Sequence, residues 1–278
     1  NREKRLKLGN RKVTISIVGH DHDVEIRHFL SDLSAFAQTS VKKVVVTLNL
    51  PTSVLPRWIE ARKWPFQLEV IKNYSPLGFG ANHNQAFEKC ETEYFCVVNP
   101  DIRLPYDPFE ELISEFTDRN VGCVYPLHLN GDQVPRDHSR EIPSPGRLIK
   151  RYLVPGHRNR TSGTDWVNAA FMLFPARIYR MTGGFDTSFF MYCEDVEICL
   201  RLSLQGYRIK VCRKTVVEHE AKHASRKKIG HLYWHLRSLM KLWKSDIYRQ
   251  YCSKQNSRPQ ETGEPSIVVD RAAVNSVE

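Results

Sequence analysis

The sequence predicts an α/β fold built on a mostly parallel central sheet. Runs of β-branched residues recur through the first half of the chain, amphipathic helical patterns lie between them, and polar residues follow several runs directly. Strands that alternate with helices favour a parallel sheet covered on both faces. Ligands bind such sheets beyond the carboxyl ends of the strands, so the polar residues that follow the strands are the first candidates for a site.

The first half of the chain supplies the parallel part of the predicted sheet. Its expected strands are the apolar runs Val13–Val18, Val44–Leu48, Leu68–Ile71 and Tyr94–Val98. Two helices are expected between them from the 3.6-residue spacing of apolar side chains, Val24–Ala37 and Ala81–Lys89.

The second half is less regular. Its expected strands are Val121–Tyr125, Asp165–Phe174, Tyr207–Cys212 and Thr215–Val217. Its expected helices are Pro175–Met181, Glu194–Gln205 with Gly206 as a C-terminal stop, and the basic amphipathic helix Ile229–Tyr248. Leu129–Gly163 is rich in Pro, Gly, Arg and His and predicts long loops. The polar tail at the C-terminus predicts little order.

Composition and charge restrict the class of protein. Hydrophobic content of 41% and charged content of 26% are ordinary for a soluble domain, and no apolar run is long enough to span a bilayer. No signal peptide is visible, and the 7 cysteines form no C-x-x-C pair, so we expect reduced thiols and a cytoplasmic protein.

The net charge of +10 is concentrated near the two ends of the chain. It suits a membrane surface, a diphosphate or nucleic acid, and equally a solvated basic face. No nucleic-acid-binding signature is present, so no nucleic-acid partner is expected.

Polar residues follow three of the expected strands. His20 and Asp21 follow the first, Asn49 follows the second, and Asn99-Pro100-Asp101 follows the fourth. Asp101 suits a hard cation such as Mg²⁺ or Mn²⁺, which prefers carboxylate and phosphate oxygens. Asn-Pro-Asp is also ordinary turn chemistry, and both interpretations remain open on spacing alone.

The segment from Gly78 through Gly80 to Asn84 opens a helix and could bring backbone amides close to a phosphate or a ribose. Its spacing matches neither the P-loop nor the dinucleotide fingerprint, and a tight turn is the alternative.

Glu194 and Asp195 begin a helix after an aromatic run. Acidic residues in a first turn commonly complement the helix dipole, which also keeps a carboxylate ionised, as a general base requires.

His219-Glu220-Ala221-Lys222-His223 matches the H-E-x-x-H pattern of zinc proteases. That pattern requires a helix, whereas this segment follows a strand-like run, so a single metal ligand at His219 is the preferred interpretation. Arg136, His138 and Arg140 form a basic cluster that is either an anion site or a solvated loop.

Taken in order, these segments resemble the rhamnosyltransferase-like branch of the family 2 glycosyltransferases over residues 12–245. The resemblance rests on the motifs Gly78–Asn84, Asn99-Pro100-Asp101, Gly183-Gly184-Phe185-Asp186, Phe190–Glu197, Val217-Glu218-His219 and Ser225. Of these, G-G-F-D followed by F-x-Y-x-E-D-V-E is the most specific.

The resemblance implies a GT-A fold: a single Rossmann-like domain over residues 12–225, with a nucleotide-binding half (12–103) and an acceptor half (104–225). A basic tail (1–11), a basic amphipathic helix (226–252) and a polar tail (253–278) flank it. The resemblance also implies Asp195 as general base next to Glu194, and Asp101 and His219 as ligands of Mg²⁺ or Mn²⁺. Donor contacts are implied at the strand-end and glycine-segment residues, namely His20, Asp21, Asn49, Gly78, Gly80, Asn84, Asn99 and Asp101.

The chain departs from the family pattern at three places. Asn99 replaces the first acid of the D-x-D metal motif, and Asn49 is the nearest substitute for the aspartate after the second strand. Asn168-Ala169-Ala170 stands where the family often has Gly-Ala, which affects the sugar pocket.

The expected function is therefore an inverting, metal-dependent hexosyltransferase of cell-surface polysaccharide synthesis. The donor would be a nucleoside-diphosphate sugar, with dTDP-rhamnose and a UDP-sugar both compatible, and the acceptor a glycan or a lipid-diphosphate-linked glycan. The basic C-terminal helix is compatible with peripheral contact to an anionic membrane on the inner face of the cytoplasmic membrane. The rival of another class is a degenerate sugar-nucleotide or glycan-binding protein, which Asn99 motivates. A basic nucleic-acid-binding module is the second rival.

Overall fold

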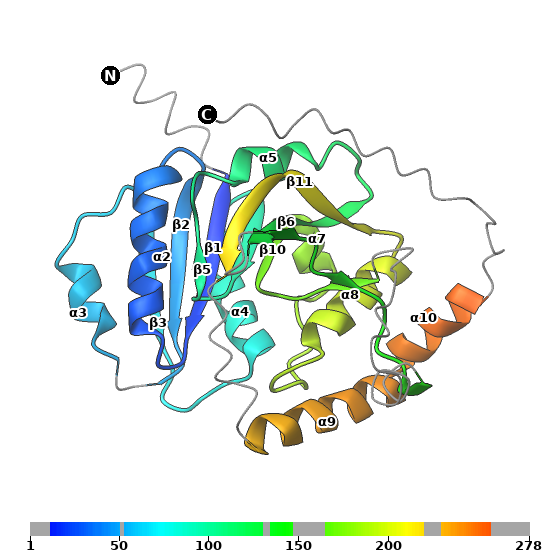
Figure 1. The fold of residues 1–278 in the computed structure, drawn as a ribbon. Helices are drawn as coiled ribbons and strands as arrows, with labels where there is room; N and C mark the ends of the chain where they lie inside the picture. Colours follow the sequence, from blue (N-terminus) through cyan, green and yellow to red (C-terminus); the bar gives the residue numbers. More distant parts are fainter. Residues whose placement is uncertain (1–11, 51–52, 130–133, 147–164, 220–228, 257–278) are drawn as a thin grey trace.

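A computed structural model describes residues 12–50, 53–129, 134–146, 165–219 and 229–256 (Figure 1). A nine-stranded sheet passes through its centre in the order β3-β2-β1-β4-β10-β6-β11-β5, and β7 pairs with β6. The strands of this sheet are β1 (Val13–Gly19), β2 (Val41–Leu48), β3 (Gln67–Lys72), β4 (Tyr94–Val98), β5 (Ile102–Arg103), β6 (Val121–Leu129), β7 (Pro135–Arg136), β10 (Phe171–Pro175) and β11 (Arg208–His219). A separate pair joins β8 (Ser139–Arg140) to β9 (Trp166–Val167).

The described helices pack on this sheet or, at the C-terminal end of the described chain, on another helix. They are α2 (Asp23–Phe36), α3 (Leu55–Glu60), α4 (Phe79–Phe87), α5 (Phe109–Ser114), α7 (Ala176–Met181), α8 (Glu194–Leu204), α9 (Ile229–Lys244) and α10 (Asp246–Asn256). None of them combines the length and the apolar character that a bilayer-spanning helix needs.

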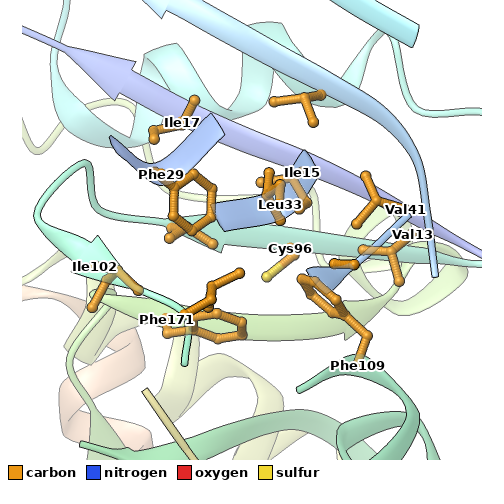
Figure 2. Packing of buried hydrophobic residues seen from close by; sticks show 14 of the residues in the cluster. Val13, Ile15, Ile17, Phe29, Leu33, Val41, Cys96, Ile102, Phe109 and Phe171 are labelled. Atoms are coloured by element: carbon orange, nitrogen blue, oxygen red, sulfur yellow. The ribbon is translucent and has the colours of Figure 1, made fainter. Parts of the chain in front are cut away.

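The strands β1 to β4 form the parallel half of the sheet. β1 pairs in parallel with both β2 and β4, and β2 pairs in parallel with β3, so the four strands predicted from the first half of the chain are all present. Figure 2 shows the core beneath them, where Phe29 and Leu33 of α2 lie among Ile15 and Ile17 of β1. The carboxyl ends of these strands therefore meet at one edge of a well-packed layer.

The strands from β5 onward form the mixed half. β10 runs antiparallel to both β4 and β6, β11 runs parallel to β6, and β5 runs antiparallel to β11. The two short strands expected at Tyr207–Cys212 and Thr215–Val217 are one strand, because a register shift between Cys212 and Val216 absorbs the residues between them. The longer strand carries His219 to the end of the sheet.

The predicted C-terminal helix is two helices. Ser245 separates α9 from α10, where its Oγ accepts a hydrogen bond from the N–H of Tyr248 at 3.2 Å, as an N-cap side chain does. α10 then continues to Asn256, beyond the expected end at residue 252. Helix α10 packs on α8, and Leu239 and Leu242 of α9 share a buried cluster with Tyr251 of α10 and with residues of α8.

Three segments discussed in the sequence analysis lie partly or wholly outside the described residues. The tail 1–11 and residues 257–278 lie outside, as does most of the loop region expected at 129–163. The described parts of that region contain β7 and β8, which the sequence did not predict.

Candidate functional site

The candidate site lies at the carboxyl ends of β1 and β4. β4 lies on one side of β1 and β2 lies on the other, so the strand order changes direction between β1 and β4. His20 and Asp21 follow β1 and are exposed, and Asn99 follows β4. The N–H of Asn99 donates to the carbonyl of Ala170 at 2.9 Å, which ties this strand end to the start of β10. This edge is where a doubly wound sheet binds its ligands.

Strained backbone concentrates near the candidate residues. In the described ranges, the non-glycine residues with positive φ are Asp21 (66°), Tyr192 (72°) and Cys193 (67°). Asp21 follows β1, and the other two immediately precede Glu194. A left-handed backbone is costly for such residues and is common at functional sites.

Asp101 and His219 are brought together by the pairing of β5 with β11. His219 lies opposite Ile102 in that ladder, and its Nε2 is 3.3 Å from Oδ2 of Asp101. Burial opposes ionisation of Asp101, but the hydrogen bond and charge of His219, with the charge of His22, lower the pKa of this carboxyl below its ordinary value. Oδ1 of Asp101 and Nδ1 of His219 are buried and have no hydrogen-bond partner within the described ranges.

Two more histidines border His219. His128 lies on β6 opposite Val217, and His138 follows β7. The rings of His128 and His138 stack with centroids 4.4 Å apart, and His219 meets His128 edge-on at 5.5 Å. Burial, followed by the neighbouring histidines, lowers the pKa of His128 to about 2. Burial is also the main cause that lowers the pKa of His138 to about 4, so both imidazoles are neutral at physiological pH.

Glu194 and Asp195 begin α8. Burial raises the pKa of both carboxyls, and the negative charge of Asp195 raises that of Glu194 further. Asp195 accepts hydrogen bonds from the N–H groups of Val196, at 2.8 Å, and Ala169. Oε2 of Glu194 is buried and finds no partner among the described residues. Because the N–H groups favour an ionised Asp195, the pair is best described as an ionised Asp195 beside a protonated Glu194.

The segment Asn168–Ala170 connects these groups. Nδ2 of Asn168 lies 3.1 Å from Nδ1 of His138, the N–H of Ala169 bonds Asp195, and the carbonyl of Ala170 accepts from Asn99. Three consecutive residues therefore touch the histidine cluster, the acidic pair and the strand end that leads to Asp101.

Several residues predicted to bind the donor are engaged within the protein. Oδ1 of Asn49 accepts from the N–H of Leu77 and from Asn73, and its amide donates to the carbonyl of Leu77. Asn84 lies among Tyr179 and Phe185, with both of its amide atoms bonded. These two asparagines hold the glycine segment and the G-G-F-D turn in place.

The two glycines of the segment are needed for close packing. A Cβ on Gly78 would lie 2.8 Å from the carbonyl oxygen of Phe190, and one on Gly80 would lie 2.5 Å from Cβ of Phe185. The segment thereby fixes the loop that leads to Glu194.

The first histidine of the H-E-x-x-H pattern does not lie on a helix. His219 ends a β-strand, whereas the protease motif requires a helix, and His223 lies outside the described residues. Ser225 lies outside them as well.

His128 was not predicted as a site residue, and its only sign in the sequence is a histidine within an otherwise apolar strand. Asn168 was expected to affect the sugar pocket, but its contact with His138 was not predicted.

Residues 11–233 match the family described as glycosyltransferase like family 2. Rhamnosyltransferase WbbL of Escherichia coli (strain K12) is 26% identical over 253 residues, which are 81% of this chain and 90% of that protein. The N-acetylglucosaminyl-diphospho-decaprenol L-rhamnosyltransferase of Mycobacterium tuberculosis is 32% identical over 244 residues, covering 77% and 78% of the two chains.

Solved structures of low sequence identity share the fold. Mannosyltransferase PcManGT from Pyrobaculum calidifontis, in complex with GDP-Man and Mn²⁺, has a TM-score of 0.59 at 17% identity, over 91% of this chain and 66% of that one. S. aureus TarS 1-349 in complex with UDP-GlcNAc has a TM-score of 0.59 at 16% identity, over 91% and 74%. The GT-A fold expected from the sequence is thus confirmed.

Proposed function

Because the chain belongs to glycosyltransferase family 2, we propose that it transfers rhamnose from a nucleoside diphosphate to a hydroxyl of a lipid-diphosphate-linked glycan. The names of two similar proteins specify rhamnosyl transfer, and one of them names a diphospho-decaprenol-linked sugar. dTDP and UDP remain the candidate nucleotides of the donor. The product would serve cell-surface polysaccharide synthesis.

The observation that carries this proposal is the segment Asn168–Ala170. It contacts the acidic pair through Ala169 and the strand end before Asp101 through Ala170. A sugar transferase needs a base for the acceptor and a positive site for the leaving diphosphate on the two sides of one anomeric carbon. A single short segment that joins both candidates keeps their separation fixed.

Asp195 is the proposed general base. It would take the proton of the acceptor hydroxyl while that oxygen bonds to the anomeric carbon and the nucleoside diphosphate leaves from the opposite face, which inverts the centre. The pKa of Asp195 is raised by burial, which strengthens it as a base, and its N–H donors keep it ionised. A protonated Glu194 beside it would avoid a second charge in the same buried site.

Asp101 and His219 fit a divalent cation. The carboxylate of Asp101 suits Mg²⁺ or Mn²⁺, and Nε2 of His219 lies 3.3 Å from its Oδ2, so the imidazole would border an ion held there. When bound, the ion would neutralise the charge of the leaving diphosphate. His20, Asp21 and Asn99 border this edge and are the proposed donor contacts with accessible side chains. Gly78, Gly80, Asn49 and Asn84 would shape the donor pocket from behind.

Helix α9 supports a lipid-linked acceptor at the inner face of the cytoplasmic membrane. Leu232, Tyr233, Leu236 and Met240 are each more than half exposed, and Arg237 lies among them. The opposite face docks on the loop before Glu194, where Ser238 donates to the carbonyl of Met191 at 2.8 Å. An exposed apolar row with basic neighbours suits an anionic bilayer surface.

Liposome flotation tests this contact. Leu232→Asp with Leu236→Asp should abolish binding to anionic vesicles, whereas Val54→Asp, another exposed apolar site, should retain it. Equal binding of the two variants would remove the membrane from the proposal.

The transferase site itself is tested by a thermal-shift panel of nucleoside diphosphates, with and without Mn²⁺. Stabilisation by one nucleotide only in the presence of metal is the expected result, and it would identify the donor base. No response to any nucleotide would contradict the donor site. A response without sugar transfer or donor hydrolysis would favour the degenerate binding protein that Asn99 motivates.

A further inference from the structure

Three strands bring three imidazoles to one point. β11 pairs in parallel with β6, which sets Val217 opposite His128 and carries His219 past it. β7 pairs with β6 opposite His128, and the chain then returns His138 to the same place. One ligand nitrogen from each of His128, His138 and His219 can be chosen so that all lie within 4.8 Å of one another. Such a separation needs only small side-chain movements to surround one ion.

His128 is an unusual residue for a core strand. Its side chain is fully buried, and neither ring nitrogen has a hydrogen-bond partner in the described part of the chain. A buried polar group left unpaired is costly, so a residue of this kind points to a ligand that occupies it. Nδ1 of His219 is buried and unpaired in the same sense. The unpaired nitrogens therefore gather at one cluster.

Asn168 is placed to orient the third imidazole. Its Nδ2 lies 3.1 Å from Nδ1 of His138, while its Oδ1 is buried and unpaired within the described ranges. A half-turn of the amide would let Oδ1 accept a hydrogen bond from Nδ1–H and leave Nε2 of His138 with a free lone pair. Histidines that ligate metals generally donate their other ring N–H in this way.

We propose that His128, His138 and His219 bind a divalent transition-metal ion of the Zn²⁺ or Co²⁺ type in preference to Mg²⁺. Imidazole nitrogen suits these ions, whereas Mg²⁺ demands oxygen ligands and keeps much of its water. Asp101 contacts His219, so its carboxylate borders the same cluster. The role of the ion at the donor diphosphate rests on the proposed function. The binding of the ion to the three histidines does not, because it requires no nucleotide.

The test is a Co²⁺ titration of the chelator-treated full chain, followed by visible absorption and without nucleotide. The wild type should develop the ligand-field bands of imidazole-bound Co²⁺, Zn²⁺ should remove them, and excess Mg²⁺ should not. His138→Ala and His128→Asn should each weaken Co²⁺ binding by about tenfold or more, and Asn168→Ala by a smaller factor. His28→Ala, at an exposed histidine on α2, is the matched control and should bind as the wild type does.

His219 is left unchanged in these variants. A loss of Co²⁺ affinity therefore reports the contribution of His128 or His138. His138 is only half-buried, so its replacement carries the test even if His128→Asn fails to fold by circular dichroism. Absence of bands in the wild type, displacement by equimolar Mg²⁺, or unchanged affinity in His138→Ala would overturn the proposal. A chain that binds Co²⁺ through these histidines but transfers no sugar would retain the metal site and contradict the transferase function instead.

Discussion

The asparagines that follow the parallel strands differ from the titratable groups of the candidate site in how their hydrogen bonds are satisfied. At the carboxyl ends of β2 and β3, the amides of Asn49, Asn73 and Asn82 bond one another and the backbone of Leu77. Asn84 is likewise occupied by Tyr179 and Phe185. In the mixed half and at the strand end that joins it, buried atoms of Asp101, His128, Glu194 and His219 have no partner among the described residues.

The difference separates scaffold from reactive groups. A buried amide that already makes its hydrogen bonds stabilises the loop around it and has little left to offer a ligand. A buried carboxyl or imidazole without a partner costs stability and is kept where a ligand or a reaction uses it. We therefore propose that the asparagines at the parallel strand ends frame the donor site and that the groups of the mixed half carry the chemistry.

The largest effect on stability is expected at Asn84. Asn84→Ala removes the partner of the Tyr179 hydroxyl and of both backbone groups of Phe185, and each group left unpaired costs about 1–3 kcal/mol. Urea denaturation should show this loss, while donor affinity of the folded protein stays the same. Gln85→Ala, at an exposed neighbour, should change neither quantity. A selective loss of donor affinity without loss of stability would make Asn84 a ligand-binding residue and break the comparison.

A smaller effect, on donor affinity alone, is expected at Asp101. Asp101→Ala should weaken binding of the nucleoside diphosphate by about 10–100-fold in the presence of Mn²⁺, because the variant loses a carboxylate beside His219. Calorimetry without metal should show the same weak binding in variant and wild type. Unchanged affinity with Mn²⁺ present would remove Asp101 from the ion site.

A third effect concerns Glu194 and depends on pH. Burial first, and then the charge of Asp195, raises the folded-state pKa of Glu194 above its unfolded value. Its contribution to stability is therefore fully present below the unfolded pKa and is lost as the pH rises through the folded pKa. The glutamine of Glu194→Gln cannot ionise. As the pH rises from the unfolded to the folded pKa, the free energy of unfolding of the variant should therefore increase relative to that of the wild type, by about 1.4 kcal/mol for each pH unit.

Thermal or urea unfolding across pH measures this difference. Glu110→Gln, at an exposed carboxyl of α5, serves as the control with no such trend. A difference between Glu194→Gln and the wild type that stays constant with pH would show that the buried pair does not share its charge as described.

The sequence predicted the parallel half better than the mixed half. The strands β1, β2 and β4 are local apolar runs buried on both faces, where local patterns suffice, and β3 is a partly buried edge strand. The six-residue helices α3 and α5 were missed, since six residues hardly repeat a helical period, whereas α7 of the same length was predicted. The union of two predicted strands into β11 depends on a register shift with β6, which no local pattern records.

The candidate site shows the same limit. Asp101, Glu194, Asp195 and His219 were predicted because they stand in motifs that resemble a known family. The closeness of His128 and His138 to His219 arises from the pairing of β6 with both β11 and β7, which joins residues far apart in the chain. The internal partners of Asn49 and Asn84 are equally non-local, so both residues were predicted to contact the donor.

The most direct test of the division between frame and chemistry is sugar transfer by Asp195→Asn, compared with its donor affinity. The substitution removes the proposed base with little change of shape, so turnover should fall by about 10²–10⁴-fold while the donor binds as in the wild type. Glu194→Gln, which mimics the protonated neighbour, should retain most of the turnover at neutral pH. Near-normal turnover of Asp195→Asn would contradict the assignment of the reactive groups to the mixed half.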